Sequence, residues 1–375
     1  MPSPENDARK KELNQLVVHH YPIWLLRFWH GMEPGAWLRI LLQNRFRVHP
    51  TRFYVAFTVT AAGPLNAFFR LCQDWLYGRR IARTEIGTPP VFIIGHWRSG
   101  TTFLHELLAQ DERFGYPTTY ECFAPRHFLV SQWIMPRLLG FLLPRTRPMD
   151  NMDAAFHLPQ EDEFALANMG YPTPYLHLVF PNQPPCYMEL LDMEEVPPDV
   201  LERWKEGLFW FAKALTFSKK RPLILKSPPH TGRVQILSEL FPGARFIHMT
   251  RHPETMFAST RRLWASLRAA QGLQIPDCEQ LDPFIFECFE RMYRAFEKQR
   301  PSLPPECICD VRYEDLVQDP LGQLQSIYER LHLGDFEQVR RGGAGRGQEG
   351  LPAEPSRRSG AGHPRPDSTA LGLLL

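Results

Sequence analysis

The stretch PPVFIIGHWRSGTTFLHELL, residues 89–108, passes from an apolar run into a helical pattern across one glycine-rich turn. The run VFIIG predicts a buried strand, and from Thr101 onward the apolar side chains recur at the spacing of one helix face. The turn between them reads Gly95-x4-Gly100-Thr101-Thr102. It is close to the phosphate-binding loop G-x-x-x-x-G-K-S/T, but threonine stands where that loop has lysine. The stretch therefore predicts a strand, an anion-binding loop and a helix in succession.

The same alternation continues through residues 86–335, where short apolar runs are separated by helical patterns. Such alternation is typical of βαβ units built on a parallel sheet. Further strands are predicted at PLILKSPP, residues 222–229, at ARFIHMTRHP, residues 244–253, and at ICDVRYEDL, residues 308–316. We predict an α/β, P-loop-like three-layer fold with a central parallel sheet.

Residues 1–85 are rich in Trp, Phe and Leu, and their polar start lacks the apolar core of a signal peptide. The apolar runs are interrupted by His and Arg, which favours helices that lie on a membrane surface or cover a pocket. Residues 53–69 are uncharged, but a run of this length is at the short limit for crossing a bilayer. If the segment faces a membrane, Trp24, Trp29 and Trp37 should be exposed; in an ordinary helical core they should be buried. We predict a helical N-terminal segment with peripheral membrane contact.

Composition limits the partners and the compartment. The 43 basic and 41 acidic residues give a net charge of +2, which argues against a general nucleic-acid binder. The seven cysteines form no C-x-x-C pairs, so neither a disulfide framework nor a zinc site is expected, and a reducing, cytoplasmic location follows. Residues 340–375 are rich in Gly, Pro and Arg and lack aromatics, so we predict a disordered tail over residues 336–375.

The predicted loop carries several groups that bind anions. Gly95 and Gly100 permit the tight turn, and the following helix directs backbone N–H groups at a ligand. A guanidinium in the loop binds two oxygens at once, and hydroxyls add further donors. No acidic strand end is placed to hold magnesium beside the loop, so we expect an anion that is handled without a metal. The side-chain donors are Arg98, Ser99, Thr101 and Thr102.

A second group of donors is predicted at another strand end. Arg251 directly follows the run ARFIHMT, and Ser259 comes eight residues later in the next helical pattern. Two helical turns bring Ser259 back toward the strand end. The pair is therefore predicted to bind a second phosphate; a surface arginine and an unrelated helical serine are the alternative.

Four motifs together resemble the sulfotransferases that use 3′-phosphoadenosine 5′-phosphosulfate. They are GHWRSGTTFLHELL, LILKSPPH, FIHMTRHPETMFAST and VRYEDLVQDP, and they fall within residues 86–335. The RSGTT form is similar to the tyrosylprotein and bacterial members, whereas the cytosolic members have lysine in the loop. The resemblance implies that Arg251 and Ser259 bind the 3′-phosphate and that Phe103 lies near the adenine. It implies that the 5′-phosphosulfate is bound by Arg98, Ser99, Gly100, Thr101 and Thr102.

The resemblance also implies the catalytic groups, with Arg98 among them. Lys226 matches the family's lysine near the bridging oxygen, where a cation stabilises the charge that grows on the leaving phosphate. Glu121 follows the first helix at about the distance at which tyrosylprotein and trehalose sulfotransferases have a catalytic glutamate, so we predict it as the base. His230 is the competitor, although it lies farther from Lys226 than the catalytic histidine of the cytosolic enzymes lies from the equivalent lysine. Further carboxylate candidates are Glu161, Asp162 and Glu163.

These motifs predict transfer of a sulfuryl group to a hydroxyl or amine acceptor, apolar or membrane-borne, with no metal required. Two alternatives remain open. A P-loop kinase would need the missing loop lysine and magnesium ligands. A membrane-associated binding protein with an inactive nucleotide site is the second, because RRGGAGRG at residues 340–347 only imitates the family's late R-K-G motif. The intact Arg98, Lys226, Arg251 and Ser259 argue against it.

Overall fold

Four parallel strands form the central sheet of the computed structural model, which describes residues 15–150, 152–277 and 279–337. The order is β2-β1-β3-β4, with Phe92 of β1 opposite Leu225. Each strand lies within a run that predicts it, so the predicted α/β fold with a parallel sheet is confirmed. The strands are β1 (Val91–Ile94), β2 (Ile224–Lys226), β3 (Arg245–Thr250) and β4 (Ile308–Arg312).

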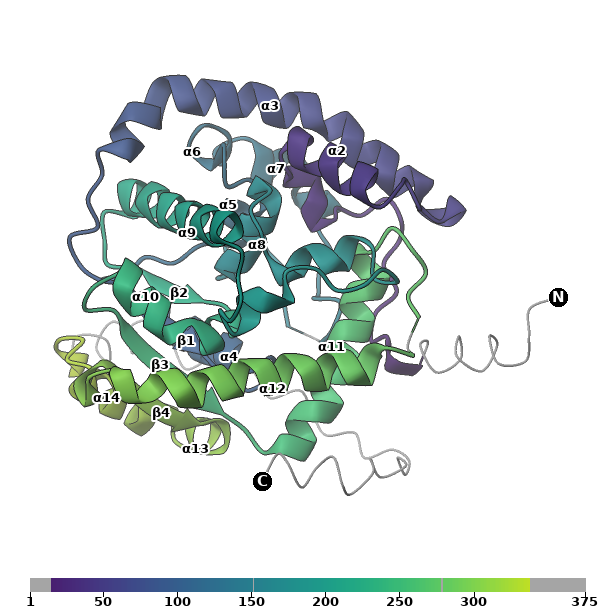
Figure 1. The fold of residues 1–375 in the computed structure, drawn as a ribbon. Coiled ribbons are helices and arrows are strands. Elements are labelled where there is room, and N and C mark those ends of the chain that lie inside the picture. Colours follow the sequence, from purple (N-terminus) through teal and green to yellow (C-terminus); the bar gives the residue numbers. More distant parts are fainter. Residues whose placement is uncertain (1–14, 151, 278, 338–375) are drawn as a thin grey trace.

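Both faces of the sheet are covered, because side chains alternate along each strand. Phe92 and Ile94 belong to the larger hydrophobic core, and Val91 and Ile93 to the smaller one. Figure 1 shows the helices that surround the sheet and make up the outer layers. The larger core is formed with α8 (Asp162–Met169), α9 (Pro198–Lys219), α11 (Pro253–Gln271) and α12 (Leu281–Gln299). The smaller core is formed with α4 (Thr101–Leu108), α13 (Tyr313–Gln318) and α14 (Pro320–Arg330).

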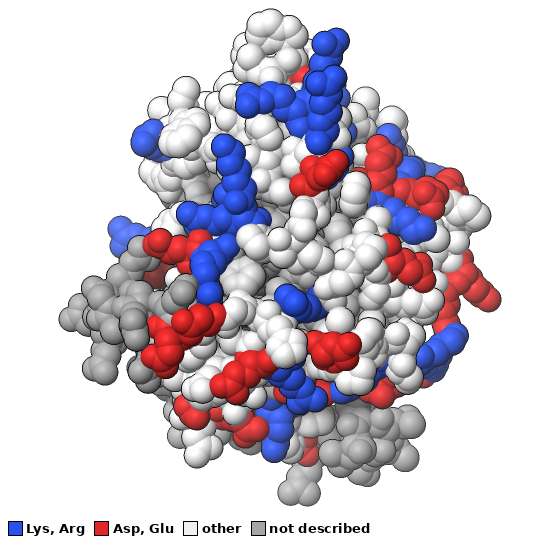
Figure 2. All heavy atoms as spheres, turned by 90° about the vertical axis from the view of Figure 1, so that its left-hand side faces the viewer, with Lys and Arg blue, Asp and Glu red and all other residues white. Residues whose placement is uncertain are grey.

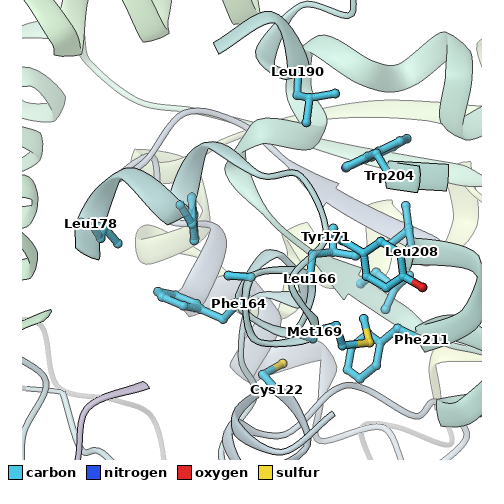
Figure 3. Close-up of a cluster of buried hydrophobic side chains, with 14 of the residues drawn as sticks. Cys122, Phe164, Leu166, Met169, Tyr171, Leu178, Leu190, Trp204, Leu208 and Phe211 are labelled. Carbon is cyan, nitrogen blue, oxygen red and sulfur yellow. The ribbon is translucent and has the colours of Figure 1, made fainter. Parts of the chain in front are cut away.

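Helix α8 is held in place by the larger core. Figure 3 shows Leu166 and Met169 of α8 gathered with Leu208 and Phe211 of α9. All four side chains are buried. This packing matters for the site, because α8 begins directly after Glu161 and carries two of the candidate carboxylates in its first turn.

The N-terminal helices lie across the outside of this body (Figure 1). They are joined to it at Trp29, whose Nε1 donates a hydrogen bond to the carbonyl oxygen of Gln271 over 2.8 Å. A Cβ on Gly31 would lie 1.7 Å from the carbonyl oxygen of Phe123, so the chain here passes directly against the body. The helices not yet named are α2 (Pro34–Gln43), α3 (Phe53–Ala82), α5 (Thr119–Phe123), α6 (Phe128–Ser131), α7 (Met135–Leu139) and α10 (Val234–Leu240).

The three N-terminal tryptophans do not share one environment. Trp24 is exposed, whereas Trp29 and Trp37 are buried, so the alternative of an ordinary helical core is correct for two of the three. Trp37 Nε1 also donates a hydrogen bond to Thr60 Oγ1 over 2.9 Å. The segment Pro50–Ala82 forms a helix that is, by length and composition, long enough and apolar enough to cross a membrane. Only 22% of its most apolar window is buried.

The carboxy-terminal predictions fall mostly outside the described residues. Residues 338–375 and the motif RRGGAGRG are among those not described. Phe336, at the start of the predicted tail, is buried in the smaller core with its ring centroid 5.3 Å from that of Tyr328. Six of the seven cysteines are described, and all six are free thiols.

Candidate active site

The glycine-rich turn joins β1 to α4 in a backbone conformation that two glycines make possible. Gly95 has a φ of 132° and Gly100 a φ of 99°, a region that other residues rarely adopt. A Cβ on Gly95 would lie 2.4 Å from the carbonyl oxygen of Met249, and one on Gly100 would lie 2.3 Å from the Tyr313 ring. Strand β3 and the first residue after β4 therefore hold the turn from two sides.

Some hydrogen-bond donors of the turn have no partner within the described residues. The Ser99 hydroxyl is buried and has no hydrogen-bond partner within the described part of the chain. The first N–H groups of α4 have no carbonyl partner in their own helix, as at every helix N-terminus. A buried, unpartnered hydroxyl beside such N–H groups is suited to an oxyanion.

Arg98 connects the turn to the second predicted group of donors. Its Nε donates a hydrogen bond to Ser259 Oγ over 2.9 Å, and its carbonyl oxygen accepts one from Arg251 Nη1 over 3.1 Å. Its Nη1 forms an ion pair with Asp150 over 2.7 Å. The guanidinium of Arg251 lies 4.2 Å from the centroid of the Tyr313 ring. The structure thus brings Arg98, Arg251 and Ser259 together in one contact network.

The Arg98–Asp150 pair is charged although it is partly buried. Burial lowers the pKa of Arg98, and Asp150 opposes this effect. Burial also raises the pKa of Asp150, but Arg147 and Arg98 outweigh it and hold that pKa below its ordinary value. In the structure Asp150 therefore occupies Nη1 of Arg98.

Lys226 ends β2, next to the turn at the same edge of the sheet. Its Nζ donates a hydrogen bond to Glu161 Oε1 over 2.8 Å and lies 3.4 Å from Thr102 Oγ1 in the turn. The other oxygen of Glu161 accepts a hydrogen bond from the Tyr175 hydroxyl, which in turn accepts one from Trp97 Nε1 over 2.9 Å. Lys226 thus reaches the first turn of α4, and Glu161 is its carboxylate partner.

The two carboxylates after Glu161 are held in buried networks. Asp162 lies 2.9 Å from His230 Nε2 and accepts a hydrogen bond from the Ser227 hydroxyl. Burial raises the pKa of Asp162, but His230 and Ser227 outweigh it and keep that pKa low. Glu163 forms an ion pair with Arg233 over 2.8 Å, and both side chains are fully buried. His230 is fully buried as well, and its Nδ1 has no hydrogen-bond partner within the described residues.

Glu121 lies on α5 and is anchored at both carboxylate oxygens. Its Oε2 accepts hydrogen bonds from the Thr118 N–H over 2.8 Å and from the Thr118 hydroxyl over 2.9 Å, and its Oε1 pairs with Lys219 over 2.8 Å. Lys226 is contacted by the carboxylate of Glu161, whereas the carboxylate of Glu121 contacts Lys219. Glu121 lines a cavity of about 500 Å³ together with Lys219, Phe156 and other residues.

The cavity and Lys226 are connected through two adjacent chain segments. The Tyr120 N–H donates a hydrogen bond to the Phe156 carbonyl over 2.9 Å, and the Gln160 N–H donates one to the Pro117 carbonyl over 2.9 Å. The segment before Glu161 therefore runs beside the one that carries Glu121. This pairing places the cavity next to the segment that supports Lys226.

Phe103 stands at the edge of the smaller core. Its side chain is half-buried, and its ring centroid lies 6.5 Å from that of Tyr313 in an edge-on arrangement. Since Tyr313 also contacts Gly100 and Arg251, Phe103 lies next to the turn.

Among the residues with described positions, no group of three or more His, Cys, Asp or Glu side chains is placed to hold a metal ion.

Comparison with known protein families identifies the family that has this arrangement of residues. The model of the sulfotransferase family matches residues 89–338, which include the turn, all four strands and both groups of donors. The chain belongs to the sulfotransferase family. Two curated relatives, from Mycobacterium bovis and Mycobacterium tuberculosis, are both named omega-hydroxy-beta-dihydromenaquinone-9 sulfotransferase Stf3. Each is 45% identical over 314 residues, which is 84% of this chain and 81% of the relative.

Two solved sulfotransferases share the fold. Sulfotransferase STF1 from Mycobacterium tuberculosis aligns over 91% of this chain and 93% of its own with a TM-score of 0.60. Sulfotransferase STF9 from Mycobacterium avium aligns over 84% of this chain and 87% of its own with a TM-score of 0.60. Both are 17% identical to this chain, so they support the fold. The predicted family, fold and enzyme class are confirmed: the chain is a sulfotransferase.

Some contacts of this sulfotransferase carry little signal in the sequence. Asp150, the ion-pair partner of Arg98, stands in PRTRPMD, which matches no motif. Tyr313 stands in a recognised motif, but the pattern VRYEDL predicts only the end of a strand. Tyr175 lies far from every motif, and its link to Glu161 depends on how α8 packs. Asp150 and Tyr313 contact segments that are distant in the sequence, whereas Tyr175 and Glu161 are 14 residues apart.

Proposed function

We propose that this sulfotransferase moves a sulfuryl group from 3′-phosphoadenosine 5′-phosphosulfate to the hydroxyl of an apolar acceptor. One observation carries the proposal: Arg98 of the turn contacts both Arg251 and Ser259, so two groups of anion donors meet at a single residue. A nucleotide with phosphates at two positions can use both groups.

In this proposal the 5′-phosphosulfate binds the turn, Ser99 through Thr102, and the first N–H groups of α4. The unpartnered Ser99 hydroxyl supports this assignment. The 3′-phosphate binds Arg251 and Ser259, which already touch Arg98. Phe103 and Tyr313 then flank the nucleotide beside the turn.

Lys226 is proposed to stabilise the transfer itself. The acceptor oxygen attacks sulfur in line, the bond between sulfur and the bridging phosphate oxygen breaks, and adenosine 3′,5′-bisphosphate leaves. Negative charge grows on that bridging oxygen, and a buried ammonium next to the turn stabilises it. Its contact with Thr102 supports this position. When Lys226 turns to the donor, its hydrogen bond to Glu161 is exchanged for one to the donor.

Glu121 is proposed as the base that takes the acceptor proton. It lines the cavity next to the segment that supports Lys226, which is where an acceptor can enter. Glu161 is the competing carboxylate because it contacts Lys226 directly, and we assign it the role of positioning that lysine. His230 is assigned a structural role, because its Nε2 is held by Asp162.

The acceptor is proposed to be a hydroxyl on a long apolar molecule. The two curated relatives are named for an omega-hydroxylated menaquinone derivative, and the cavity beside Glu121 has apolar walls that include Leu143 and Phe156. A cytoplasmic location with peripheral membrane contact fits such an acceptor, which would be dissolved in a membrane.

The proposal is tested by measuring nucleotide affinity by titration calorimetry. Adenosine 3′,5′-bisphosphate should bind far more tightly than adenosine 5′-phosphate, because only the former reaches Arg251 and Ser259. Loss of a charge-assisted hydrogen bond costs about 1.5–3 kcal/mol. Arg251→Ala should therefore remove most of the preference, whereas Arg294→Ala, an exposed arginine on α12, should leave it unchanged.

Two outcomes would contradict the proposal. Equal affinity of the wild-type protein for the two nucleotides would remove the second phosphate site. Tight, magnesium-dependent binding of ATP together with weak binding of the bisphosphate would favour the kinase alternative instead.

A further inference from the structure

Helix α3 turns an apolar face to the outside of the molecule. Its buried side chains, among them Val55, Val59 and Asn66, recur at helical spacing on the side that meets the body. The most apolar window has a mean hydropathy of 1.3. Figure 1 shows the rest of the drawn helices and strands on the inner side of α3. The large apolar residues exposed on α3 are Phe53, Tyr54, Phe57, Leu65, Phe68, Leu71, Trp75 and Leu76.

The chain around this face is strongly basic. Residues 33–85 contain eight arginines and no lysine against three acids, Glu33, Asp74 and Glu85, and Arg70 pairs with Glu33 over 3.2 Å. Figure 2 shows Lys and Arg side chains gathered on the upper part of the side at which α3 ends. Positive charge beside exposed aromatic residues is typical of a helix that lies on an anionic membrane. The centre of an interface between proteins is instead depleted of charge.

A second apolar patch borders the cavity that Glu121 lines. The segment 132–143 supplies both the patch and a wall of the cavity, because the two sets of residues alternate along it. The cavity therefore opens beside exposed apolar side chains. The exposed residues of this patch are Trp133, Ile134, Leu138 and Phe141. The wall residues are Gln132, Pro136, Arg137, Gly140 and Leu143.

The two patches are joined through α6. The Leu129 N–H donates a hydrogen bond to Gln73 Oε1 of α3 over 2.9 Å. The His127 ring stacks on Phe69 of α3 with centroids 5.6 Å apart. Since α6 directly precedes the patch at residues 133–141, that patch is attached to the same helix that carries the larger apolar face.

From this arrangement we infer that the outer face of α3 and the patch at residues 133–141 dock together on an anionic lipid bilayer. The cavity beside Glu121 then opens toward the lipid and admits a membrane-dissolved alcohol. The inference of docking depends only on the exposed surface described above. The inference that an acceptor enters through the cavity rests on the proposed function. A second copy of this chain is the competing occupant of the face, and the test distinguishes the two.

Docking is tested by flotation with vesicles of phosphatidylcholine, with and without phosphatidylglycerol. The wild-type protein should float with the anionic vesicles. The triple variant Phe68→Ser, Leu71→Ser, Trp75→Ser should lose at least about tenfold in partitioning, because each side chain contributes apolar area to the contact. The matched control is Leu321→Ser, an equally exposed leucine on α14, which should float like the wild type.

The charge component is tested separately. Arg79→Gln with Arg83→Gln should weaken flotation on anionic vesicles and leave binding to neutral vesicles unchanged. Arg294→Gln with Lys298→Gln removes the same charge from α12 and should have no effect. Wild-type protein that stays with the buffer, or an α3 triple variant that turns a dimer into a monomer without changing flotation, would overturn the docking inference.

Entry through the cavity is tested with two acceptors: a short-chain alcohol in buffer and a long-chain fatty alcohol in the vesicles. The α3 triple variant should lose turnover of the vesicle-borne acceptor and keep turnover of the soluble one. A Cβ at Gly140 meets no atom within 4 Å, so Gly140→Phe adds a side chain at the cavity without a backbone clash. It should lower turnover of the long acceptor by about tenfold or more relative to the short one. Gly87→Phe, also in open space, is the control.

The results separate this inference from the proposed function. Vesicle binding without turnover of either acceptor would contradict the proposed function and leave the docking intact. Equal loss of both acceptors in Gly140→Phe, with nucleotide affinity unchanged, would overturn entry through the cavity.

Discussion

The body around the sheet and the outer face of α3 depart in opposite ways from the usual distribution of charged and apolar side chains. The body buries ionised groups completely, as in the pair of Glu163 and Arg233. Helix α3 leaves large apolar groups in solvent, with Trp75 85% exposed. Buried charges bring little stability even when paired, and exposed apolar area forgoes about 25 cal/mol per Å². Stability alone therefore accounts for neither region.

The largest expected effect tests whether the anchored charges of the body are catalytic. Glu121→Gln should lower turnover by about 10²–10⁴-fold, the usual contribution of a general base, with nucleotide affinity unchanged. Glu161→Gln should lose less, because Lys226 keeps a hydrogen-bonding partner. His230→Ala should act mainly on stability, which a denaturant titration measures. If Glu161→Gln is inactive while Glu121→Gln turns over normally, the base is Glu161.

The next effect compares one substitution in the two regions. Leu166→Ala removes a fully buried side chain from the core between α8 and α9 and should destabilise the protein by about 2–5 kcal/mol. Leu71→Ala removes the same atoms from the exposed face of α3 and should change stability by less than about 0.5 kcal/mol. Urea denaturation measures both. A large loss in Leu71→Ala would mean that something covers this face in solution.

A smaller effect sharpens the description of the turn. Asp150 occupies Arg98 in the structure, so Asp150→Asn removes an anion that competes with the nucleotide. Affinity for adenosine 3′,5′-bisphosphate should rise by about tenfold, the equivalent of one charge-assisted hydrogen bond. Asp153→Asn changes a nearby acid that pairs with no arginine of the turn and serves as the control. Weaker binding in Asp150→Asn would show that Asp150 positions Arg98 instead of competing for it.

The last effect concerns acid and develops gradually as the pH falls. Burial, followed by nearby Lys226, lowers the pKa of His105 to about 3, and neither ring nitrogen has a partner within the described residues. Below about pH 6.5 the unfolded chain binds a proton that the folded protein does not, so stability falls as the pH drops toward 3. His105→Leu should reduce that slope by up to about 1.4 kcal/mol per pH unit. An unchanged slope between pH 6.5 and 5, measured by urea denaturation, would exclude this histidine.

The sequence predicted what depends on local pattern. The strands follow from apolar runs, and the position of Ser259 two turns into the helix after β3 follows from the helical period. It did not indicate Asp150, because an ion pair between distant segments leaves no periodic trace. It also could not tell which of Trp24, Trp29 and Trp37 would be exposed, since an aromatic residue suits a core as well as a membrane surface.

The position of α3 in the chain has a consequence for biosynthesis. Helix α3 is complete before any strand of the sheet has been made, whereas Tyr313, which closes on Gly100, is among the last described residues to be added. Chains begin to fold from the end that leaves the ribosome first. For most of its synthesis the nascent protein therefore carries an apolar helix that only the preceding residues 28–43 can cover. We expect a membrane or a chaperone to engage α3 during translation, well before the turn at Gly100 is closed by Tyr313.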